Sequence, residues 1–406
     1  MPSPSIPPHE VVITGVGIVT ALGVGWKANA EGFRDGRVAL KEVTVFNTAA
    51  QRVHIAGEVP LPAMLPPHSL SPKDQSRLER GGKLLLHAAS EALEAASVAP
   101  STPLDLVLGT SAGAMAHGEE FYRRLRQSSS RKGQAVRAYH YLISNQATLL
   151  ARAYALEART TILSNACASG ANALGHAAHL IQTGRTAMAL AGGYDALSHL
   201  VFAGFDALKA LSVTLPRPFD AGRDGLALGE GAALLVMESR AHAEARGATI
   251  LARLVGYGFA TDLHHLTQPH PEGHAAQRSM TMACRAANLQ PSQIDYLNSH
   301  GTGTPLNDPA EAAAIAAWAG NAAAALPVSS TKGSIGHLLG GAGAVEAVVC
   351  LMAMREGFLP PTVHHRETMP GCPFDLITTP RNASVRTALT NSFGFGGSNA
   401  SLIFQA

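Results

Sequence analysis

The stretch from Leu163 to Gly184, LSNACASGANALGHAAHLIQTG, constrains the possible folds more than any other part of the chain. It follows a strand-like run at 160–163, and its residues predict a turn, a helix that starts at Cys167 and a stop at Gly184. Alanine, glycine and serine dominate this helix, so neighbouring backbone can approach it closely. We therefore expect a buried helix in a tightly packed core.

Cys167 at the start of this helix is a candidate nucleophile. The positive end of the helix dipole and the unpaired backbone N–H groups of the first turn both favour the thiolate, which is the reactive form. Taken alone, an inert buried cysteine is the more frequent case, because free cysteine is among the most buried residue types. Two histidine motifs further along the chain favour the catalytic interpretation.

Length and composition allow a large core in two domains or two duplicated halves, since 46% of the 406 residues are hydrophobic and 15% are charged. The net charge of +2 argues against nucleic-acid binding by the whole molecule. The cysteines, at 167, 284, 350 and 372, contain no CxxC pair, which disfavours a disulfide framework or a zinc site and suits a cytoplasmic location.

Two segments are considered as membrane segments, and the sequence favours neither. Residues 1–10, MPSPSIPPHE, have no apolar core and are expected to be a disordered lead-in, not a signal peptide. The alanine-rich tract at 310–326 is interrupted by Glu311, Gly320 and Asn321, so we expect a packed helix there and no membrane span.

Strand-like and helix-like segments alternate along the chain, which predicts an α/β layered fold. In the first part we expect strands at 11–15 (closed by Gly15), 104–110, 160–163, 187–192 and 231–237, and helices at 24–33 and 75–97. The alternation restarts near residue 250, with strands at 251–256, 294–299, 326–330, 385–391 and 401–404 and helices at 273–287, 307–319 and 340–355. This repetition predicts a duplicated fold with halves at 11–250 and 251–406.

Glycine-rich segments follow three of the later strands and carry further reactive side chains. They are NSHGTGTP at 298–305 with His300, SSTKGSIGHLLGGAG at 329–343 with Lys332 and His337, and NSFGFGGSNA at 391–400 with Phe395. Loops at the carboxyl ends of strands converge on one rim of an α/β sheet, so we expect them to meet near Cys167. A thiol with two histidines supplies a nucleophile, a proton-transfer group and hydrogen-bond donors to an oxyanion.

NACASG, NSHGTGTP, STKGSIGHLLGGAGAVE and NSFGFGGSNA, in this order, closely resemble the motifs of the β-ketoacyl-[acyl-carrier-protein] synthases of the type I/II class. The block RPFDAGRDGLALGEGAALLVME at 217–238 is similar to a further family segment, and the likeness extends from Val11 to Phe404. The resemblance implies a thiolase-like fold, with two duplicated halves in a five-layer α-β-α-β-α sandwich. It also implies an acyltransferase that performs decarboxylative Claisen condensation with malonyl carrier protein, adding two carbons in fatty-acid or specialised polyketide or polyene biosynthesis.

The resemblance also implies roles for single residues. Cys167 would accept the acyl group, and His300 and His337 would promote malonyl decarboxylation and stabilise the enolate. Lys332, with Glu346 as its carboxylate partner, would support the site electrostatically. The other implied roles are the oxyanion hole for the N–H groups of Cys167 and Phe395, the gate for Phe395, phosphopantetheine binding for Thr302 and Thr304, and the acyl pocket for Ala112 and Phe205.

Basic residues are dense between Arg123 and Arg137, which indicates either a solvated helix face and loop or a dock for an acidic partner. No aromatic residues are interleaved as in nucleic-acid-binding segments. By resemblance, the carrier-protein docking residues are Lys73, Arg77, Arg131, Lys132 and Lys209.

The chain departs from ordinary family members in three places. The usual Gly-Pro before the nucleophile strand is replaced by residues 156–159, LEAR, and the segment 139–155 differs from the usual pattern. Ala112 stands where many members carry a bulky gate residue. These differences favour a specialised pathway, such as polyene or aryl-polyene synthesis.

The resemblance implies no resident cofactor, because phosphopantetheine arrives on the carrier protein, and no metal. The histidines of DLHHLTQPHPEGH at 262–274 are therefore interpreted as part of a structural loop. The expected partners are an acyl carrier protein, acyl and malonyl thioesters, and a second chain in a homodimer or in a heterodimer with a chain-length factor.

Two alternatives remain from the sequence: a non-catalytic chain-length-factor subunit, and a thiolase of the same fold. Such subunits lack the nucleophile, whereas Cys167 and both histidines are present. Thiolases use a second cysteine in the last glycine-rich loop, where NSFGFGGSNA has none. The initiating type III synthases, with asparagine in place of His337, are also disfavoured.

Overall fold

The computed structural model describes residues 9–127 and 134–406. Arg131 and Lys132, two of the expected docking residues, lie outside the described residues, as do residues 1–8 of the expected lead-in. His9 and Glu10 are described: the His9 N–H donates to the Gln182 carbonyl at 3.1 Å, and Glu10 pairs with Arg240. The packed structure therefore includes two residues that we expected in the lead-in.

The strands of the N-terminal half form the first layer of sheet. They are β1 (Val11–Thr20), β5 (Pro103–Gly109), β6 (Glu157–Leu163), β7 (Met188–Asp195) and β8 (Gly231–Ser239). Their order across the sheet is β6-β5-β7-β8-β1, with β5 parallel to β6 and β7, and β8 antiparallel to β7 and β1.

The C-terminal half repeats this arrangement. Its strands are β9 (Ala252–Thr261), β10 (Tyr296–Asn298), β11 (Pro327–Ser329), β15 (Thr387–Gly394) and β16 (Ser398–Gln405). Their order is β11-β10-β15-β16-β9, with β10 parallel to β11 and β15, and β16 antiparallel to β15 and β9. Both halves thus place their strands in the same order relative to the chain, as expected for a duplicated fold; the boundary at residue 250 stays a prediction.

The two sets of strands are joined where β1 meets β9, through the pairs Val12 with Arg253 and Ile13 with Ala252. Within the described residues they form one 12-stranded sheet, which also includes β2 (Gly23–Val24) and β13 (Asp375–Leu376). The other short strands are β3 (Lys41–Glu42), β4 (Ile55–Ala56), β12 (Phe358–Leu359) and β14 (Arg381–Asn382).

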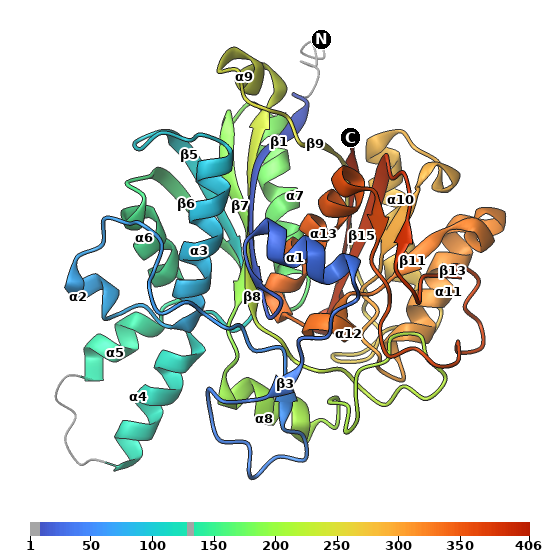
Figure 1. Ribbon diagram of the computed structural model, residues 1–406, viewed down its shortest axis with the longest axis horizontal. Helices are drawn as coiled ribbons and strands as arrows, with labels where there is room; N and C mark the ends of the chain where they lie inside the picture. Colours follow the sequence, from blue (N-terminus) through green and yellow to red (C-terminus); the bar gives the residue numbers. More distant parts are fainter. Residues whose placement is uncertain (1–8, 128–133) are drawn as a thin grey trace.

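Helices complete the layers. Outer helix α3 (Arg80–Ala95) packs on β1 and β8, and outer helix α10 (His274–Ala287) packs on β9 and β16. Between the sheets lie α7 (Ser169–Gln182) and α13 (Ala342–Glu356), which contact each other (Figure 1). The predicted five-layer α-β-α-β-α sandwich of thiolase type is confirmed.

The central helices can touch because their first turns are made of very small residues. A Cβ on Gly343 would lie 2.7 Å from the Ala171 backbone nitrogen, and one on Gly170 would lie 3.0 Å from that of Ala344. The buried helix predicted to start at Cys167 is α7, which begins two residues later, at Ser169. Its partner α13 is buried throughout residues 342–353.

β1 runs five residues past Gly15, so the expectation that this glycine ends the strand is wrong. A Cβ on Gly15 would lie 2.3 Å from the Ala92 carbonyl oxygen, and one on Gly17 would lie 1.9 Å from that of Ala88. Both glycines therefore serve the close approach of α3 to the strand, not a turn.

Two of the remaining helices extend the outer layers: α6 (Ser144–Ala153) packs beside α3, and α11 (Asn307–Ala319) packs beside α10. The sequence predicted α1 (Trp26–Arg34) and α11. A solvated helix face was one of two interpretations of residues 123–137, parts of which lie in α4 (Met115–Gln127) and α5 (Gln134–Tyr141). The sequence did not predict α2 (Pro72–Gln75), α6, α8 (His199–Ala207), α9 (Arg240–Ala245) or α12 (Lys332–Ile335). Short 3-10 turns cover Pro291–Gln293, Gly320–Ala325, Leu339–Gly341 and Phe395–Gly397. None of the helices in the described residues has the length and apolar character needed to cross a membrane.

Candidate active site

Cys167 lies in a sharp turn between β6 and α7. Ala166, just before it, has a φ of 55°, in the left-handed region that non-glycine residues rarely adopt. The Ser169 hydroxyl stabilises the turn by accepting the Asn165 N–H at 2.9 Å and donating to the Ala166 carbonyl at 2.5 Å. Cys167 therefore lies just before the first turn of α7, and its side chain lines a cavity.

The Cys167 thiol is protonated at neutral pH. Burial raises its pKa to about 12, although the Lys332 charge and the Phe395 N–H, which donates toward the sulfur, both lower it. A helix dipole contributes about 0.3–1 kcal/mol, which is less than one pKa unit and does not offset the burial. The expectation that the helix start holds Cys167 as a thiolate is therefore wrong, and the thiol needs a proton acceptor before it reacts.

His300 follows β10 on a loop that two buried carboxylates hold. The N–H groups of His300 and Gly301 donate to the two oxygens of Glu311, at 2.8 and 2.7 Å. Asp308 accepts the N–H of Thr302 at 3.1 Å, and the Thr302 and Thr304 hydroxyls are 2.9 Å apart. Both carboxylates come from α11. The sequence showed Glu311 only as a break in an alanine-rich tract, and Asp308 was not singled out.

His337 is fixed by backbone pairing with the segment before β8. Its N–H donates to the Ala227 carbonyl at 2.7 Å, and its carbonyl accepts the Gly229 N–H at 2.9 Å. The ring centroids of His300 and His337 are 5.3 Å apart. Burial, and then the Lys332 charge, hold both pKa values well below the ordinary range, so both rings are neutral at pH 7 and each offers one N–H donor and one acceptor.

Lys332 and Glu346 form a buried ion pair beside the histidines. Their side chains are 2% and 3% exposed, and neither lines the cavity. Burial raises the pKa of Glu346 to about 7, although Lys332 lowers it. The pair places a positive charge close enough to lower the pKa of Cys167 and of both histidines.

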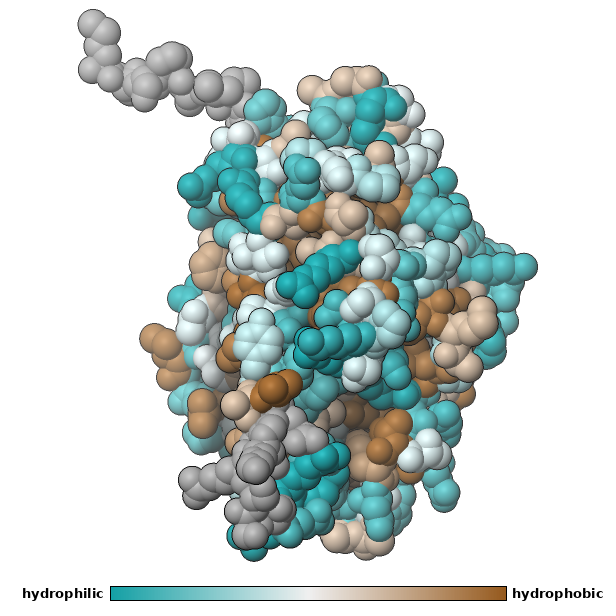
Figure 2. Space-filling model, turned by 90° about the vertical axis from the view of Figure 1, so that its left-hand side faces the viewer, coloured by the Kyte–Doolittle hydropathy of each residue, from teal (hydrophilic) through white to brown (hydrophobic). Residues whose placement is uncertain are grey.

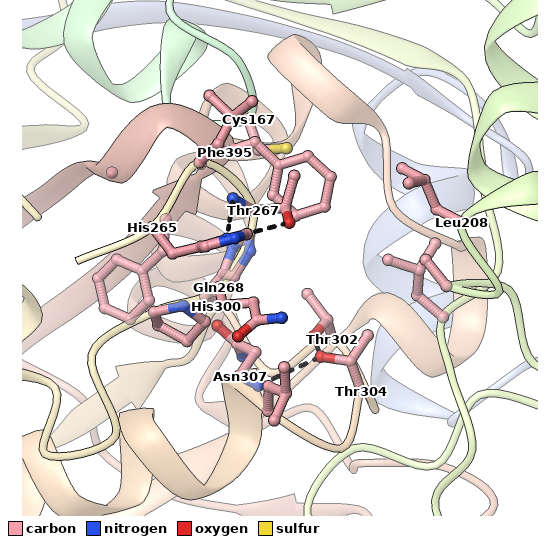
Figure 3. Close-up of a pocket in the computed structure, with 18 of the residues that line it drawn as sticks. Cys167, Leu208, His265, Thr267, Gln268, His300, Thr302, Thr304, Asn307 and Phe395 are labelled. Atoms are coloured by element: carbon pink, nitrogen blue, oxygen red, sulfur yellow. Dashed lines mark hydrogen bonds between the residues drawn. The ribbon is translucent and has the colours of Figure 1, made fainter. Parts of the chain in front are cut away.

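A cavity of about 370 Å³ brings most of the expected site residues together. Figure 3 shows Cys167 and Phe395 at one end of the cavity and Thr302 and Thr304 at the other. Leu208 lies on the side opposite His265. The expected residues that line it are Cys167, Phe205, Lys209, His300, Thr302, Thr304, His337 and Phe395.

Of the two residues expected in the acyl pocket, Phe205 lines the cavity and Ala112 does not. The Phe205 ring, from α8, stacks on Phe395, with 5.8 Å between centroids and 11° between planes. Ala112 is not part of the cavity lining. It lies in a loop held by buried Asp195, which accepts the Ala112 N–H at 2.9 Å and the Gly340 N–H at 2.6 Å.

The expected docking residues are not gathered in one place. Lys209 lines the cavity, just after α8. Lys73 lies on α2, with Arg77 just after it, and Figure 1 shows α2 well separated from α8. Arg123 and Arg124 on exposed α4 pair with Glu120.

The loop between β9 and α10 contributes cavity residues that the sequence led us to interpret as structural. His265, Thr267 and Gln268 line the cavity, and the Thr267 N–H donates to His265 Nδ1 at 3.1 Å (Figure 3). The same loop bonds to the glycine-rich loop, because the Gly396 N–H donates to the Leu266 carbonyl at 2.7 Å. The signal that could have found them is the polar H-x-T pattern directly after a strand.

Comparisons with known proteins agree with this geometry. Residues 9–243 match the model of the beta-ketoacyl synthase N-terminal domain, and residues 251–366 match that of the C-terminal domain. The 3-oxoacyl-[acyl-carrier-protein] synthase 2 of Staphylococcus aureus (strain COL) is 35% identical over 408 residues, covering 98% of each chain.

Solved structures give the same result. The ishigamide ketosynthase/chain length factor has a TM-score of 0.92 and 33% identity, covering 98% of this chain and 99% of that one. A ketosynthase in complex with its type II polyketide acyl-carrier protein has a TM-score of 0.88 and 28% identity, with the same coverage. The chain therefore belongs to the β-ketoacyl synthase family.

Proposed function

We propose that the chain takes an acyl group from an acyl carrier protein onto Cys167 and condenses it with malonyl carrier protein, extending the acyl chain by two carbons. The observation that carries the proposal is that Cys167, His300 and His337, from distant parts of the sequence, line one cavity. The buried thiol and the two neutral imidazoles are the groups that this reaction needs.

In the first half-reaction the Cys167 sulfur attacks the acyl thioester and the carrier thiol leaves. Because the thiol is protonated at rest, its proton must move, through a neutral imidazole of the pair, to the departing carrier sulfur. The developing oxyanion would accept hydrogen bonds from the backbone N–H groups of Cys167 and Phe395. The close packing of Gly394 supports this role, since a Cβ there would lie 3.0 Å from the Cys167 nitrogen.

In the second half-reaction the malonyl carbon–carbon bond breaks, carbon dioxide leaves and the electron pair forms an enolate. The N–H groups of His300 and His337 would stabilise the enolate oxygen, which requires that both rings are neutral. The enolate carbon then attacks the acyl-cysteine carbonyl, the carbon–sulfur bond breaks and Cys167 regains a proton from solvent. Lys332 supports this chemistry because its charge adds to burial in lowering the pKa values of the two imidazoles.

The phosphopantetheine arm of the carrier protein would lie along Thr302 and Thr304. Lys209, which also lines the cavity, would attract the acidic carrier protein. The reaction requires no resident cofactor or metal, and the cytoplasmic location stays a prediction. The likeness to a ketosynthase bound to its carrier protein supports this partner.

A second chain is the other proposed partner, as a homodimer or with a chain-length factor, and the ishigamide ketosynthase/chain length factor supports the latter. Exposed apolar side chains gather around α4 and α5, on the side of the molecule that Figure 2 faces. They are Tyr122, Leu125, Val136, Tyr139, Tyr141 and Leu142. Clusters of this kind mark protein interfaces.

The experiment is incubation of the protein with acyl carrier protein thioesters, followed by intact mass and peptide mapping. We expect one acyl group on Cys167 and none in Cys167→Ala, whereas the control Cys372→Ala, a partly buried cysteine away from the cavity, retains it. Acylation at another cysteine with condensation retained would overturn the assignment. An unacylated wild type would favour the non-catalytic chain-length-factor alternative.

A further inference from the structure

We propose that His270, Glu272 and His274 bind a divalent transition-metal ion of the Zn²⁺ class, which stabilises the loop between β9 and α10. Among the described residues, these three place a ligand atom each within 4.8 Å of one another. The inference revises the structural interpretation of this histidine-rich loop and does not rest on the proposed reaction.

The local structure already draws the three side chains together. The His274 Nε2 lies 3.0 Å from the Glu272 carboxylate, and the rings of His270 and His274 are 4.4 Å apart. Gly273, the residue before α10, has a φ of 61°, and its N–H donates to the His270 carbonyl at 2.8 Å, which closes a tight turn between the two histidines. Glu272 and His274 are exposed and His270 is half-buried, and small rotations of these side chains would bring the ligand atoms to the separations around one Zn²⁺ ion, which binds nitrogen and oxygen at about 2.0–2.2 Å.

The chemistry of the donor set fits this class of ion. Two imidazoles and a carboxylate suit Zn²⁺, Cu²⁺ and Ni²⁺ better than Mg²⁺ or Ca²⁺, which prefer oxygen ligands alone. His270 Nδ1 presents a lone pair, since it accepts the Glu272 N–H at 3.2 Å, and the ion would replace this long contact. Three protein ligands leave one position of a tetrahedral site for water. The His264 ring lies nearby, with its centroid 5.1 Å from that of His270.

The surrounding charge does not oppose a cation. Asp262 lies in the same surface depression and accepts the N–H groups of His264 and His270, at 3.0 and 2.8 Å. Arg278 also lines the depression, with its guanidinium donating to the Thr261 carbonyl at 2.9 Å. Glu272 and Asp262 together outweigh this one positive charge.

The loop connects this cluster to the active-site cavity. His265, Thr267 and Gln268 line the cavity, while His264, His270 and His274 line the separate depression. The Asp262 N–H donates to the Gly397 carbonyl at 2.8 Å, and the Gly396 N–H donates to the Leu266 carbonyl. An ion bound to the cluster would therefore restrain both this loop and the glycine-rich loop that carries Phe395.

The test uses the full chain without an affinity tag, freed of metal by chelator. Cys167→Ala is the parent protein, since the active-site thiol and its two histidines could themselves bind zinc. Calorimetric titration with Zn²⁺ should give one ion per chain, and Co²⁺ should give a spectrum without a thiolate charge-transfer band. His270→Ala/His274→Ala should weaken binding at least tenfold, whereas His54→Ala, an exposed histidine elsewhere, should not.

Failure of the parent to bind Zn²⁺, or equal binding by the double variant, would overturn the site. Hydrogen exchange tests the stabilisation: with Zn²⁺, amides at 262–274 and at Gly396 and Gly397 should exchange more slowly in the parent and not in the double variant. Unchanged exchange in the zinc-bound parent would overturn that part of the proposal. Because every variant lacks Cys167, none of these outcomes depends on the condensation reaction.

Discussion

The imidazole rings of His300 and His337 lie edge to face, with 5.3 Å between centroids and 86° between planes. The backbone of His300 is held by the Glu311 carboxylate and that of His337 by pairing beside Leu228, so separate contacts position the two residues. Both are neutral because of burial and the Lys332 charge. Two independently fixed N–H donors at one cavity are suited to an enolate oxygen.

His300→Ala and His337→Ala should each slow carbon dioxide release from malonyl carrier protein by about 10²–10³-fold, the usual cost of losing one oxyanion donor. Acyl loading should fall less, since its oxyanion is bound by backbone N–H groups and the remaining imidazole of the pair can still take the Cys167 proton. The two rates are measured separately, by trapped carbon dioxide and by intact mass. Unchanged carbon dioxide release in both variants would exclude the enolate-stabilising role.

The alkylation rate of Cys167 by iodoacetamide should rise steadily between pH 7 and 10, because burial raises the thiol pKa to about 12 and only the thiolate reacts. Lys332→Met/Glu346→Gln should slow alkylation, since Lys332 lowers this pKa more than Glu346 raises it. Intact mass gives the rates, with Cys167→Ala as the blank. A plateau below pH 9 would show instead that the helix start does stabilise the thiolate.

Charge reversal at Lys209 should raise the KM for carrier protein several-fold at low salt and leave kcat unchanged, because a charge at a binding rim acts mainly on association. The matched control is Arg285→Glu, an exposed residue on the outer helix α10. Steady-state kinetics at two salt concentrations provide the measurement. The same change at Lys73 or Arg77 would matter only if a second chain brings them to the mouth. Equal KM values for Lys209→Glu and the control would contradict a docking role for Lys209.

The sequence was sufficient for the layers and for the meeting of Cys167, His300 and His337. Strand-like and helix-like periodicities are local, and the carboxyl ends of strands in one sheet share a rim, so topology brings distant loops together. The structural role of Gly15 could not be predicted in this way. Its role depends on the Ala92 carbonyl of a helix 77 residues away, a contact that no local pattern reveals.

The supporting carboxylates were missed for a related reason. Glu311 and Asp308 are both buried, although acidic residues are seldom fully buried, and the sequence showed Glu311 only as a break in the alanine-rich tract. Their partners are backbone N–H groups of a loop, which any sequence offers. The resting state of Cys167 was mispredicted because the dipole can be inferred from position in a helix, whereas desolvation depends on the whole surrounding core.

Glu79→Gln should stabilise the protein at pH 8 and have little effect at pH 5. Burial raises the pKa of Glu79 to about 8 from an ordinary value of 4.5. Between these values the unfolded chain has released the proton and the folded chain keeps it, so stability falls as pH rises, by about 1.4 kcal/mol per unit. Glutamine stays neutral and removes this loss. Denaturant unfolding of both proteins at pH 5 and 8 is the measurement, and a pH-independent difference would show that Glu79 is ionised when folded.

Ala112→Phe should shorten the acyl chains that the enzyme accepts. Ala112 is only 8% exposed and its loop is tied to Asp195, so a phenylalanine there has little room. If a long acyl chain extends past the cavity to this loop, the new ring competes with it for space. Overpacking typically costs about 1–3 kcal/mol, which is about one to two factors of ten in kcat/KM for long chains. Short chains should be spared, and Ala112→Ile should fall between. Condensation is measured across acyl lengths, with unfolding midpoints as the check on folding. Because Ala112 lies outside the cavity lining, an unchanged length profile in a folded Ala112→Phe protein would mean that the acyl chain never reaches this loop.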